Sequence, residues 1–364
     1  SNMIDVKANI TLKGRGATTN QTGRYEPLQR VAIDDGWNNE DEDLPPLRTT
    51  VTYETCRTAI TFNKSPDLPF DRSINPYRGC EHGCTYCFAR PSHANMGLSP
   101  GLDFESRLFA KSNIVEALEK QLQKPGYHCR PIMLGANTDP YQPIEKTHRL
   151  SRKVLEVLRE HQHPFAIVTK SSMVLRDLDI LAPMAQKGLV SVAVSVTTLD
   201  RHLSRKLEPR ASMPEKRLQT IQQLSQAGVP ATVFASPMIP FLNDAELEAI
   251  LQAGAEAGAT SAAYTLLRLS MELKDLFADW LDIHAPGKKD HVLSLIRQNR
   301  DGELNDREFG KRMKGSGPLA ALLSKRFHLA CLKMGIDAAK ASELELDCNF
   351  FSPPPRPGDQ MALF

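Results

Sequence analysis

The chain has 364 residues, a formal net charge of +2 and a hydrophobic fraction of 41%. This length accommodates one large α/β domain with extensions, or two domains, and the near-neutral charge excludes a global basic field for binding nucleic acid. No apolar run approaches the length of a transmembrane helix and no signal-peptide run is present, which argues against contact with a membrane. With seven cysteines, three of them grouped, we expect a cytoplasmic protein whose thiols stay reduced.

Residues 1–48 are expected to form a mostly irregular N-terminal extension. They mix Gly, Asn and Thr with an acidic run at residues 38–43, followed by Pro45 and Pro46. Thr49–Phe62 then alternates β-branched and aromatic residues, which predicts a strand or a hairpin.

A regular alternation of strands and helices follows. Short apolar runs predict strands at Pro131–Gly135, Phe165–Thr169, Val190–Val196, Ala231–Ala235 and Ser261–Leu267. Amphipathic patterns predict helices at Ser112–Gln123, His148–His161, Val174–Lys187, Pro214–Ala227 and Asp244–Gly258. Gly188 and Gly228 are placed to end two of these helices.

This alternation predicts a parallel sheet, because each strand is apolar on both faces. Together with the strand that leads into Cys80, it gives a partial (β/α)6 TIM-type barrel over residues 49–285. The pattern alone does not separate this barrel from an open doubly wound sheet. In a barrel, the chemistry should lie at the carboxyl ends of the strands. Residues 286–350 are expected to form a helical C-terminal extension and residues 351–364 a Pro-rich mobile tail.

Three cysteines in a predicted loop at residues 79–92 are the most informative feature of the chain. Cys80, Cys84 and Cys87 have C-x3-C-x2-C spacing, which differs from the spacings of ferredoxins. Three thiolates can hold three irons of a cubane cluster and leave the fourth iron open to a substrate. A zinc site normally needs a second pair of ligands, and neither His82 nor His93 stands at a usual zinc spacing.

The motif, with Tyr86 before the third cysteine, resembles the signature of the radical S-adenosylmethionine (SAM) superfamily. The longer run Ser73-Ile-Asn-Pro-Tyr-Arg-Gly-Cys80 through Cys87-Phe-Ala-Arg90 resembles its spore photoproduct lyase-like branch. The resemblance covers about residues 50–285 and also implies a partial barrel. It further implies a [4Fe-4S] cluster whose open iron chelates SAM, and reductive cleavage of SAM to a 5'-deoxyadenosyl radical that abstracts hydrogen. Flavodoxin or ferredoxin would supply the electron.

The resemblance also implies which residues contact SAM at successive strand ends. Tyr86 would face the adenine, and a turn after the second strand would accept hydrogen bonds from the amino group. The family's turn is glycine-rich with a glutamate, so Thr138 and Asp139 are a departure. Arg210 would bind the carboxylate, or would instead pair with Glu208. The remaining implied contacts are Lys170 for the carboxylate, Ser195 for ribose or carboxylate, and Pro237, Met238 and Ile239 along the adenine edge.

The substrate is the least determined feature. Spore photoproduct lyase reverses a thymine dimer, so the resemblance raises nucleic acid, and with it DNA repair by a lyase, as a hypothesis. Returning a hydrogen atom to the substrate requires a thiol or a phenol near the radical. The candidates by residue type are Cys129, Tyr264, Cys331 and Cys348, and each also fits a buried core residue.

The tail ends in Gln360-Met-Ala-Leu363-Phe364, which resembles the peptide that docks bacterial repair proteins on the replication sliding clamp. Two other classes of protein therefore remain open beside the radical enzyme. One is an iron–sulfur electron carrier or sensor that does not cleave SAM. The other is a zinc-stabilised binding module tethered to the clamp.

Overall fold

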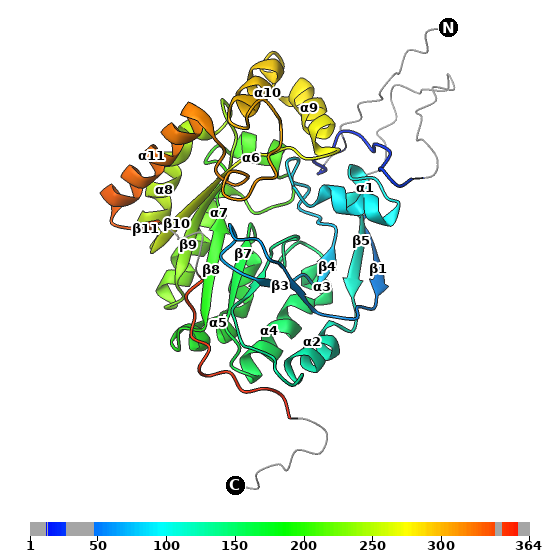
Figure 1. Ribbon diagram of the computed structural model, residues 1–364, viewed down its shortest axis with the longest axis vertical. Helices are drawn as coiled ribbons and strands as arrows, with labels where there is room; N and C mark the ends of the chain where they lie inside the picture. The colour runs from blue at the N-terminus through cyan, green and yellow to red at the C-terminus, as the bar shows by residue number, and fades with distance from the viewer. Residues whose placement is uncertain (1–11, 13, 27–46, 339–343, 356–364) are drawn as a thin grey trace.

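The computed structural model describes residue 12 and residues 14–26, 47–338 and 344–355. Its main element is an eight-stranded sheet in the order β11-β10-β9-β8-β7-β6-β3-β2 (Figure 1). Seven neighbouring strands, β11 through β3, pair in parallel, and β2 (Ile60–Phe62) pairs antiparallel with β3. The strands of the predicted barrel are β3 (Arg72–Ile74), β6 (Ile132–Leu134), β7 (Phe165–Thr169), β8 (Val190–Ser195), β9 (Ala231–Met238) and β10 (Ser261–Leu266).

The sheet is open: β2 forms one edge and β11 (Asp337–Ala338) forms the other. The predicted partial (β/α)6 barrel is confirmed. Its strands are short runs of β-branched and small apolar residues, buried where they face the helices. The segment predicted as purely helical, residues 286–350, also supplies the edge strand β11.

Helices cover the outer face of the sheet and follow the predicted pattern. They are α2 (Ile114–Leu122), α4 (Leu150–Glu160), α5 (Leu178–Ala185), α7 (Pro214–Gln226), α8 (Leu247–Glu256) and α11 (Gly317–Met334). Gly188 and Gly228 follow helices with φ of 70° and 75°, the left-handed conformation that glycine adopts at little cost. The single helix expected at Val174–Lys187 is instead the 3-10 turn η2 (Ser172–Asp177) followed by α5.

Of the strand or hairpin expected within Thr49–Phe62, the strand is confirmed and the hairpin is wrong. β1 (Thr50–Glu54) and β2 belong to different sheets. β1 pairs in parallel with β5 (Arg107–Lys111), and β4 (Tyr77–Arg78) pairs antiparallel with β5. Alternating residues identify an extended segment, but the pairing partner depends on residues far along the chain.

Short elements complete the fold around the carboxyl ends of the strands. They are η1 (Arg90–Met96), α1 (Leu102–Ser106), α3 (Glu145–His148), α6 (Arg201–Leu207), η3 (Asp244–Glu246), α9 (Leu273–His284) and α10 (Lys289–Gln298). An apolar cluster joins Cys84 and Tyr86 to Phe277 and Trp280 of α9 and to Val292 of α10. These two helices therefore form a lid of packed side chains above the cysteine loop.

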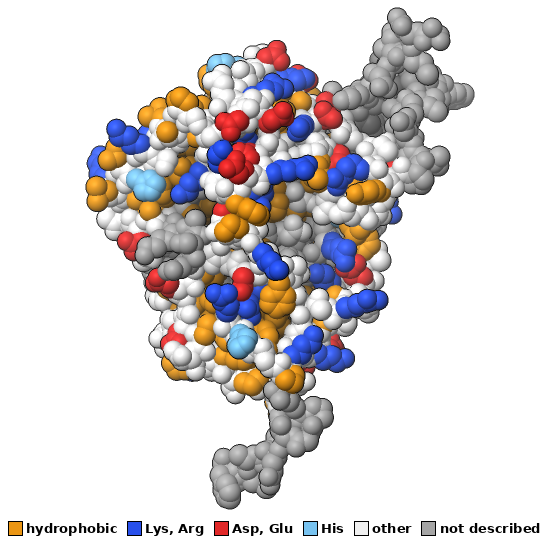
Figure 2. Space-filling view, viewed as in Figure 1, with side chains coloured by type: hydrophobic (Ala, Val, Ile, Leu, Met, Phe, Trp, Pro, Cys, Tyr) orange, Lys and Arg blue, Asp and Glu red, His pale blue; other side chains and the backbone are white. Residues whose placement is uncertain are grey.

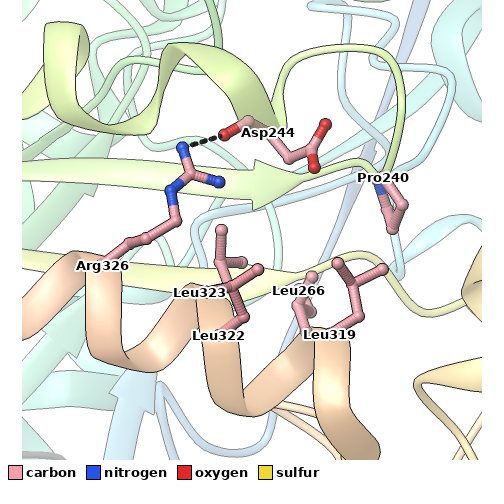
Figure 3. A pocket seen from close by; sticks show the side chains of 7 residues that line it. All are labelled: Pro240, Asp244, Leu266, Leu319, Leu322, Leu323 and Arg326. Atoms are coloured by element: carbon pink, nitrogen blue, oxygen red, sulfur yellow. Dashed lines mark hydrogen bonds between the residues drawn. The ribbon is translucent and has the colours of Figure 1, made fainter.

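Helix α11 packs beside α8 and against the loop after β9 (Figure 1). Figure 3 shows Arg326 of α11 donating to the carbonyl oxygen of Asp244 at 3.0 Å, with Leu323 turned toward Leu266. Arg326 also binds Glu248 through both carboxylate oxygens, at 2.7 and 2.6 Å. The cavity between these residues measures about 10 Å³, room for one water, so this contact is packing and not a ligand site.

Side chains of both charges are interspersed on the face shown in Figure 2, in keeping with the near-neutral net charge. Among the helices of the described ranges, none is both long and apolar enough to cross a membrane. The boundaries of the two extensions stay predictions. Residues 14–26 of the N-terminal extension pack near the cysteine loop, and in the C-terminal tail the amide of Ser352 donates to the carbonyl of His161.

Candidate active site

The three cysteines lie on a loop between β4 and η1 that folds into successive turns. The amide of Gly83 donates to the carbonyl of Cys80, and the amide of Cys87 donates to the carbonyl of Cys84, both at 3.3 Å. Gly79 and Gly83 adopt φ of 75° and 69°, and a Cβ on Gly83 would lie 2.8 Å from the Glu105 carboxylate. The turns therefore need glycine, and they bring all three thiols to the wall of one cavity.

Burial makes two of these thiols, those of Cys80 and Cys84, weakly acidic in the metal-free protein. It raises the pKa of Cys84 to about 12 and the pKa of Cys80 well above its ordinary value. The neighbouring Asp139 carboxylate and the other two cysteines raise the pKa of Cys80 further. A metal takes cysteine as thiolate, so loading an iron–sulfur cluster would release these protons.

The residues present fit a cluster held by three ligands, since three thiols face one cavity. Among the described residues, no three or more His, Cys, Asp or Glu side chains are arranged to hold a single metal ion.

A buried ion pair fixes the backbone of the cysteine loop. Arg90 donates to the carbonyl of Cys84 at 2.8 Å and to those of Pro100 and Gly101 at 3.1 and 2.9 Å. It also binds the buried carboxylate of Glu105 at 2.5 Å. This one side chain therefore ties the second cysteine to the turn before α1.

The N-terminal segment completes the support of this loop. The carboxylate of Glu105 accepts hydrogen bonds from the amides of Gly16 at 2.9 Å and Ala17 at 2.7 Å. A Cβ on Gly16 would lie 1.8 Å from the carbonyl oxygen of Gly83, so the two backbones touch. The part of the extension that was expected to be irregular is thus packed directly on the cysteine loop.

The cavity has a volume of about 1030 Å³ and is lined by residues along β7 to β10 as well as by residues at their carboxyl ends. Gly135, with φ of 90°, ends β6 so closely against β7 that a Cβ would lie 2.2 Å from the carbonyl of Val168. The polar residues of its wall that come from the cysteine loop and from strands β6 to β9 include His82, Tyr86, Asn137, Asp139, Lys170, Ser195 and Ser236.

Asp139 ties the cysteine loop to two strand ends. Its carboxylate accepts hydrogen bonds from the Thr169 hydroxyl and the Lys170 amide, both at 2.7 Å, and lies 3.3 Å from Nδ1 of His82. Burial alone would raise the pKa of Asp139, but His82 and these donors lower it to about 2. Thr138 is buried, donates to the carbonyl of Tyr77 at 3.1 Å, and is not part of the cavity wall.

Tyr86 is held by a second buried ionic group. Its hydroxyl donates to the carboxylate of Glu208, which also binds the guanidinium of Arg217 and accepts a hydrogen bond from Thr197 at 2.5 Å. Arg217 donates in turn to the carbonyl of Ser195 at 3.0 Å. The ring of Tyr86 is therefore fixed in the cavity wall by residues from the end of β8, from α6 and from α7.

Lys170, directly after β7, and Ser195, the last residue of β8, lie together. The ammonium of Lys170 is 3.5 Å from the hydroxyl oxygen of Ser195 and 5.8 Å from the centre of the Tyr86 ring. Burial alone would lower the pKa of Lys170, but Cys84 and Glu208 raise it, so the ammonium stays charged. A cation and a hydroxyl at this position can hold a carboxylate.

The structure distributes the other implied SAM contacts unevenly. Arg210 pairs at 2.8 Å with Glu81, and not with Glu208, and its amide donates to the carbonyl of His82. It therefore clamps the cysteine loop and does not line the cavity. Pro237 is part of the wall, whereas Met238 and Ile239 are fully buried behind it.

None of the four hydrogen-donor candidates lines the cavity. Tyr264 packs on Phe327 with ring centres 4.7 Å apart, and Cys331 is buried on α11. Cys129 and Cys348 lie close together, and burial and the neighbouring Cys348 thiol raise the pKa of Cys129. Gln360, Leu363 and Phe364 lie outside the described residues.

Sequence reasoning missed Arg217, Glu105 and the partnership of Glu81 with Arg210. In the sequence, Arg217 looks like one of several charges on an amphipathic helix, yet it is fully buried. The one local hint of its role is that Glu208 precedes it by a short stretch, so that the connection between two consecutive helices can bring the two side chains together. Glu105 carries no signal, because its partners come from residues 16, 17 and 90.

Fold and site together define an α/β enzyme that works at the carboxyl ends of parallel strands with a three-cysteine loop. The family model described as the radical SAM superfamily matches residues 74–253. An uncharacterized protein of Mycobacterium tuberculosis is 37% identical over 231 residues, which cover 62% of this chain and 67% of that protein. An uncharacterized protein of Methanocaldococcus jannaschii is 30% identical over 175 residues, covering 48% of this chain and 62% of that protein.

Among solved structures, a spore photoproduct lyase variant with bound AdoMet and dinucleoside spore photoproduct has a TM-score of 0.58 at 15% identity. The likeness covers 81% of this chain and 82% of that one, and it shows the same fold. This chain belongs to the radical SAM superfamily and is an enzyme of the radical SAM type. The family implies an iron–sulfur cluster and SAM as its cofactors.

Proposed function

We propose that Cys80, Cys84 and Cys87 hold a [4Fe-4S] cluster, at which this enzyme reductively cleaves SAM. One electron from the cluster would break the C5'–S bond of SAM, giving methionine and a 5'-deoxyadenosyl radical that takes a hydrogen atom from the substrate. The observation that carries the proposal is that the three thiols face the same cavity as Tyr86, Lys170 and Ser195.

Each residue of the wall has a separate task in this proposal. The Lys170 ammonium and the Ser195 hydroxyl hold the SAM carboxylate, because they offer a charge and a donor 3.5 Å apart. Tyr86, fixed through Glu208, presents its ring to the adenine. The turn at Gly135–Asn137 lines the cavity, and its backbone carbonyls would accept from the SAM amino group, a task that the resemblance assigned to Thr138 and Asp139.

The cavity is large enough for SAM and a substrate at once. Pockets for single drug-sized ligands measure roughly 300 to 1000 Å³, and this one measures about 1030 Å³. We propose nucleic acid as the substrate class, supported by the fold shared with spore photoproduct lyase. Flavodoxin or ferredoxin is the proposed reductant.

The test is anaerobic. The protein is reconstituted with iron and sulfide, reduced with dithionite and given SAM, and 5'-deoxyadenosine is measured by chromatography. We expect product from the wild type and from Cys56→Ala, whose thiol lies outside the cavity, and none from Cys84→Ala. A wild-type protein with a full cluster and no product would favour an electron carrier or sensor, and a colourless protein that retains zinc would favour a zinc module.

A further inference from the structure

Arg268 contributes a guanidinium to the cavity wall. It follows the end of β10, is partly buried and lines the cavity. Across the described ranges, 14–26, 47–338 and 344–355, no hydrogen bond or ion pair of its guanidinium is found. A guanidinium that is partly buried gains from hydrogen-bond partners, because partial removal from water without them costs free energy. Its lack of them points to a ligand.

The neighbouring charges cannot supply that partner. Arg312 also lines the cavity and takes both carboxylate oxygens of Asp67, at 2.6 and 2.5 Å. Arg300 is buried and donates to the carbonyls of Leu266, Leu267 and Arg312 at 2.9 to 3.1 Å. Asp67 is thus committed to Arg312, and this part of the wall keeps an excess of positive charge.

An aromatic ring stands beside the free guanidinium. Phe88 directly follows Cys87, lines the cavity and is 50% exposed, and its ring centre lies 5.9 Å from Cζ of Arg268. A cation next to an exposed aromatic face is the combination with which proteins bind a phosphate and the adjoining base. Arginine suits the phosphate because its planar fork matches two oxygens.

We propose that Arg268 binds a phosphate of the substrate and that Phe88 packs against the adjoining ring, so that the substrate contains a nucleotide unit. This inference rests on the proposed function, in which the SAM carboxylate is held by Lys170 and Ser195 on β7 and β8. Arg268 follows β10, two strands beyond β8, and is therefore free for the substrate. The phosphate could belong to a free nucleotide or to a polynucleotide.

The proposal is tested by binding, which needs no SAM cleavage. Cluster-loaded, oxidised protein with SAM is titrated into a fluorescein-labelled eight-nucleotide single-stranded DNA, and fluorescence anisotropy is recorded at several salt concentrations. Arg268→Gln is compared with Arg297→Gln, which removes an equal charge from the exposed face of α10. We expect Arg268→Gln to weaken binding roughly 10- to 100-fold and to reduce the salt slope by about 0.7, and the control to match the wild type.

Two further measurements keep the test decisive. Phe88→Leu should weaken binding several-fold without changing the salt slope, and Arg268→Lys should retain most of the slope. Thymidine 5'-monophosphate and thymidine are then tested as competitors of the labelled DNA, beside the unlabelled oligonucleotide. If the monophosphate competes as well per phosphate as the oligonucleotide, the site takes a free nucleotide. If only the oligonucleotide competes, the site takes a polynucleotide.

The proposal is overturned if the wild type binds neither phosphate probe, or if Arg268→Gln binds as tightly as Arg297→Gln. It is also overturned if Arg268→Gln lowers affinity for SAM and not for the probes, because the arginine would then serve the SAM carboxylate. If the phosphate site is confirmed while no 5'-deoxyadenosine forms, the proposed function fails and the phosphate site stands.

Discussion

Two buried arginines reach the cysteine loop from different parts of the chain, and they do different things. Arg90 binds Glu105 and three backbone carbonyls, so it fixes the course of the loop itself. Arg217 binds Glu208, which holds the hydroxyl of Tyr86, so it fixes a side chain that faces the cavity. The comparison separates a residue that fixes the loop proposed to carry a cluster from a residue that orients Tyr86, its proposed contact with SAM.

Removing Arg90 should have the largest effect on stability and on iron content. Arg90→Gln leaves the carboxylate of Glu105 buried without its cation, which costs about 3 to 5 kcal/mol of unfolding free energy. Urea denaturation measures that loss, and iron content after reconstitution should fall with it. Arg107 is exposed and lies 3.9 Å from Asp103, so Arg107→Gln should change the unfolding free energy by no more than about 1 kcal/mol. Its iron content should match that of the wild type. Normal iron content in Arg90→Gln would contradict the claim that Arg90 fixes the loop that carries the cluster.

Changing Glu208 should affect SAM more than the cluster. Glu208→Gln keeps the shape of the side chain but leaves Arg217 without a counter-charge, which should cost about 3 kcal/mol. We expect iron content close to that of the wild type and SAM affinity at least 10-fold weaker, measured by equilibrium dialysis. Loss of the cluster with unchanged SAM affinity per cluster would place Glu208 with Arg90 and remove the distinction.

Acid should weaken the barrel through a histidine far from both arginines. His163 is buried, and its ring nitrogens contact Tyr127 and the carbonyl of Pro164. Burial lowers its pKa to about 4, from the ordinary value of 6.5, so the unfolded chain binds a proton more readily than the folded one. The contribution of neutral His163 to the free energy of unfolding is therefore complete above pH 6.5 and is lost as the pH falls toward 4. The free energy of unfolding should fall by about 2 kcal/mol between pH 7 and pH 5.

That loss is checked by urea denaturation of the metal-free protein at both pH values. His163→Gln should reduce the pH dependence by this amount, and substitution of the exposed His128 should leave it unchanged. Equal pH dependence in the wild type and in His163→Gln would contradict the assignment.

The smallest effect is expected from Tyr86→Phe, which keeps the ring and removes only its hydroxyl. Glu208 retains Arg217 and Thr197, so the lost hydrogen bond should cost about 1 kcal/mol. SAM affinity should fall only a few-fold in the same dialysis experiment. If Tyr86→Phe lost as much SAM affinity as Glu208→Gln, Glu208 would act on SAM binding only through the Tyr86 hydroxyl.

Features that depend on neighbours in the sequence, or on the strand-end rule, were predictable. The strands, the helices and the positions of Lys170 and Ser195 at strand ends follow from apolar runs and from the parallel sheet they imply. The alternative pairing of Arg210 with Glu208 was wrong, because Glu81 is distant in sequence and only the folded loop brings it within 2.8 Å of Arg210. The pairing of β1 with β5 was unpredictable for the same reason.

The central claim is that the cysteine loop and the strand ends form one site. It is tested most directly by electron paramagnetic resonance of the reduced, cluster-loaded protein during titration with SAM, in the wild type and in Lys170→Met. The account predicts that SAM changes the spectrum of the cluster in the wild type, and that Lys170→Met needs at least 10-fold more SAM for the same change. A full cluster whose spectrum ignores SAM, or an equal response in both proteins, would contradict it.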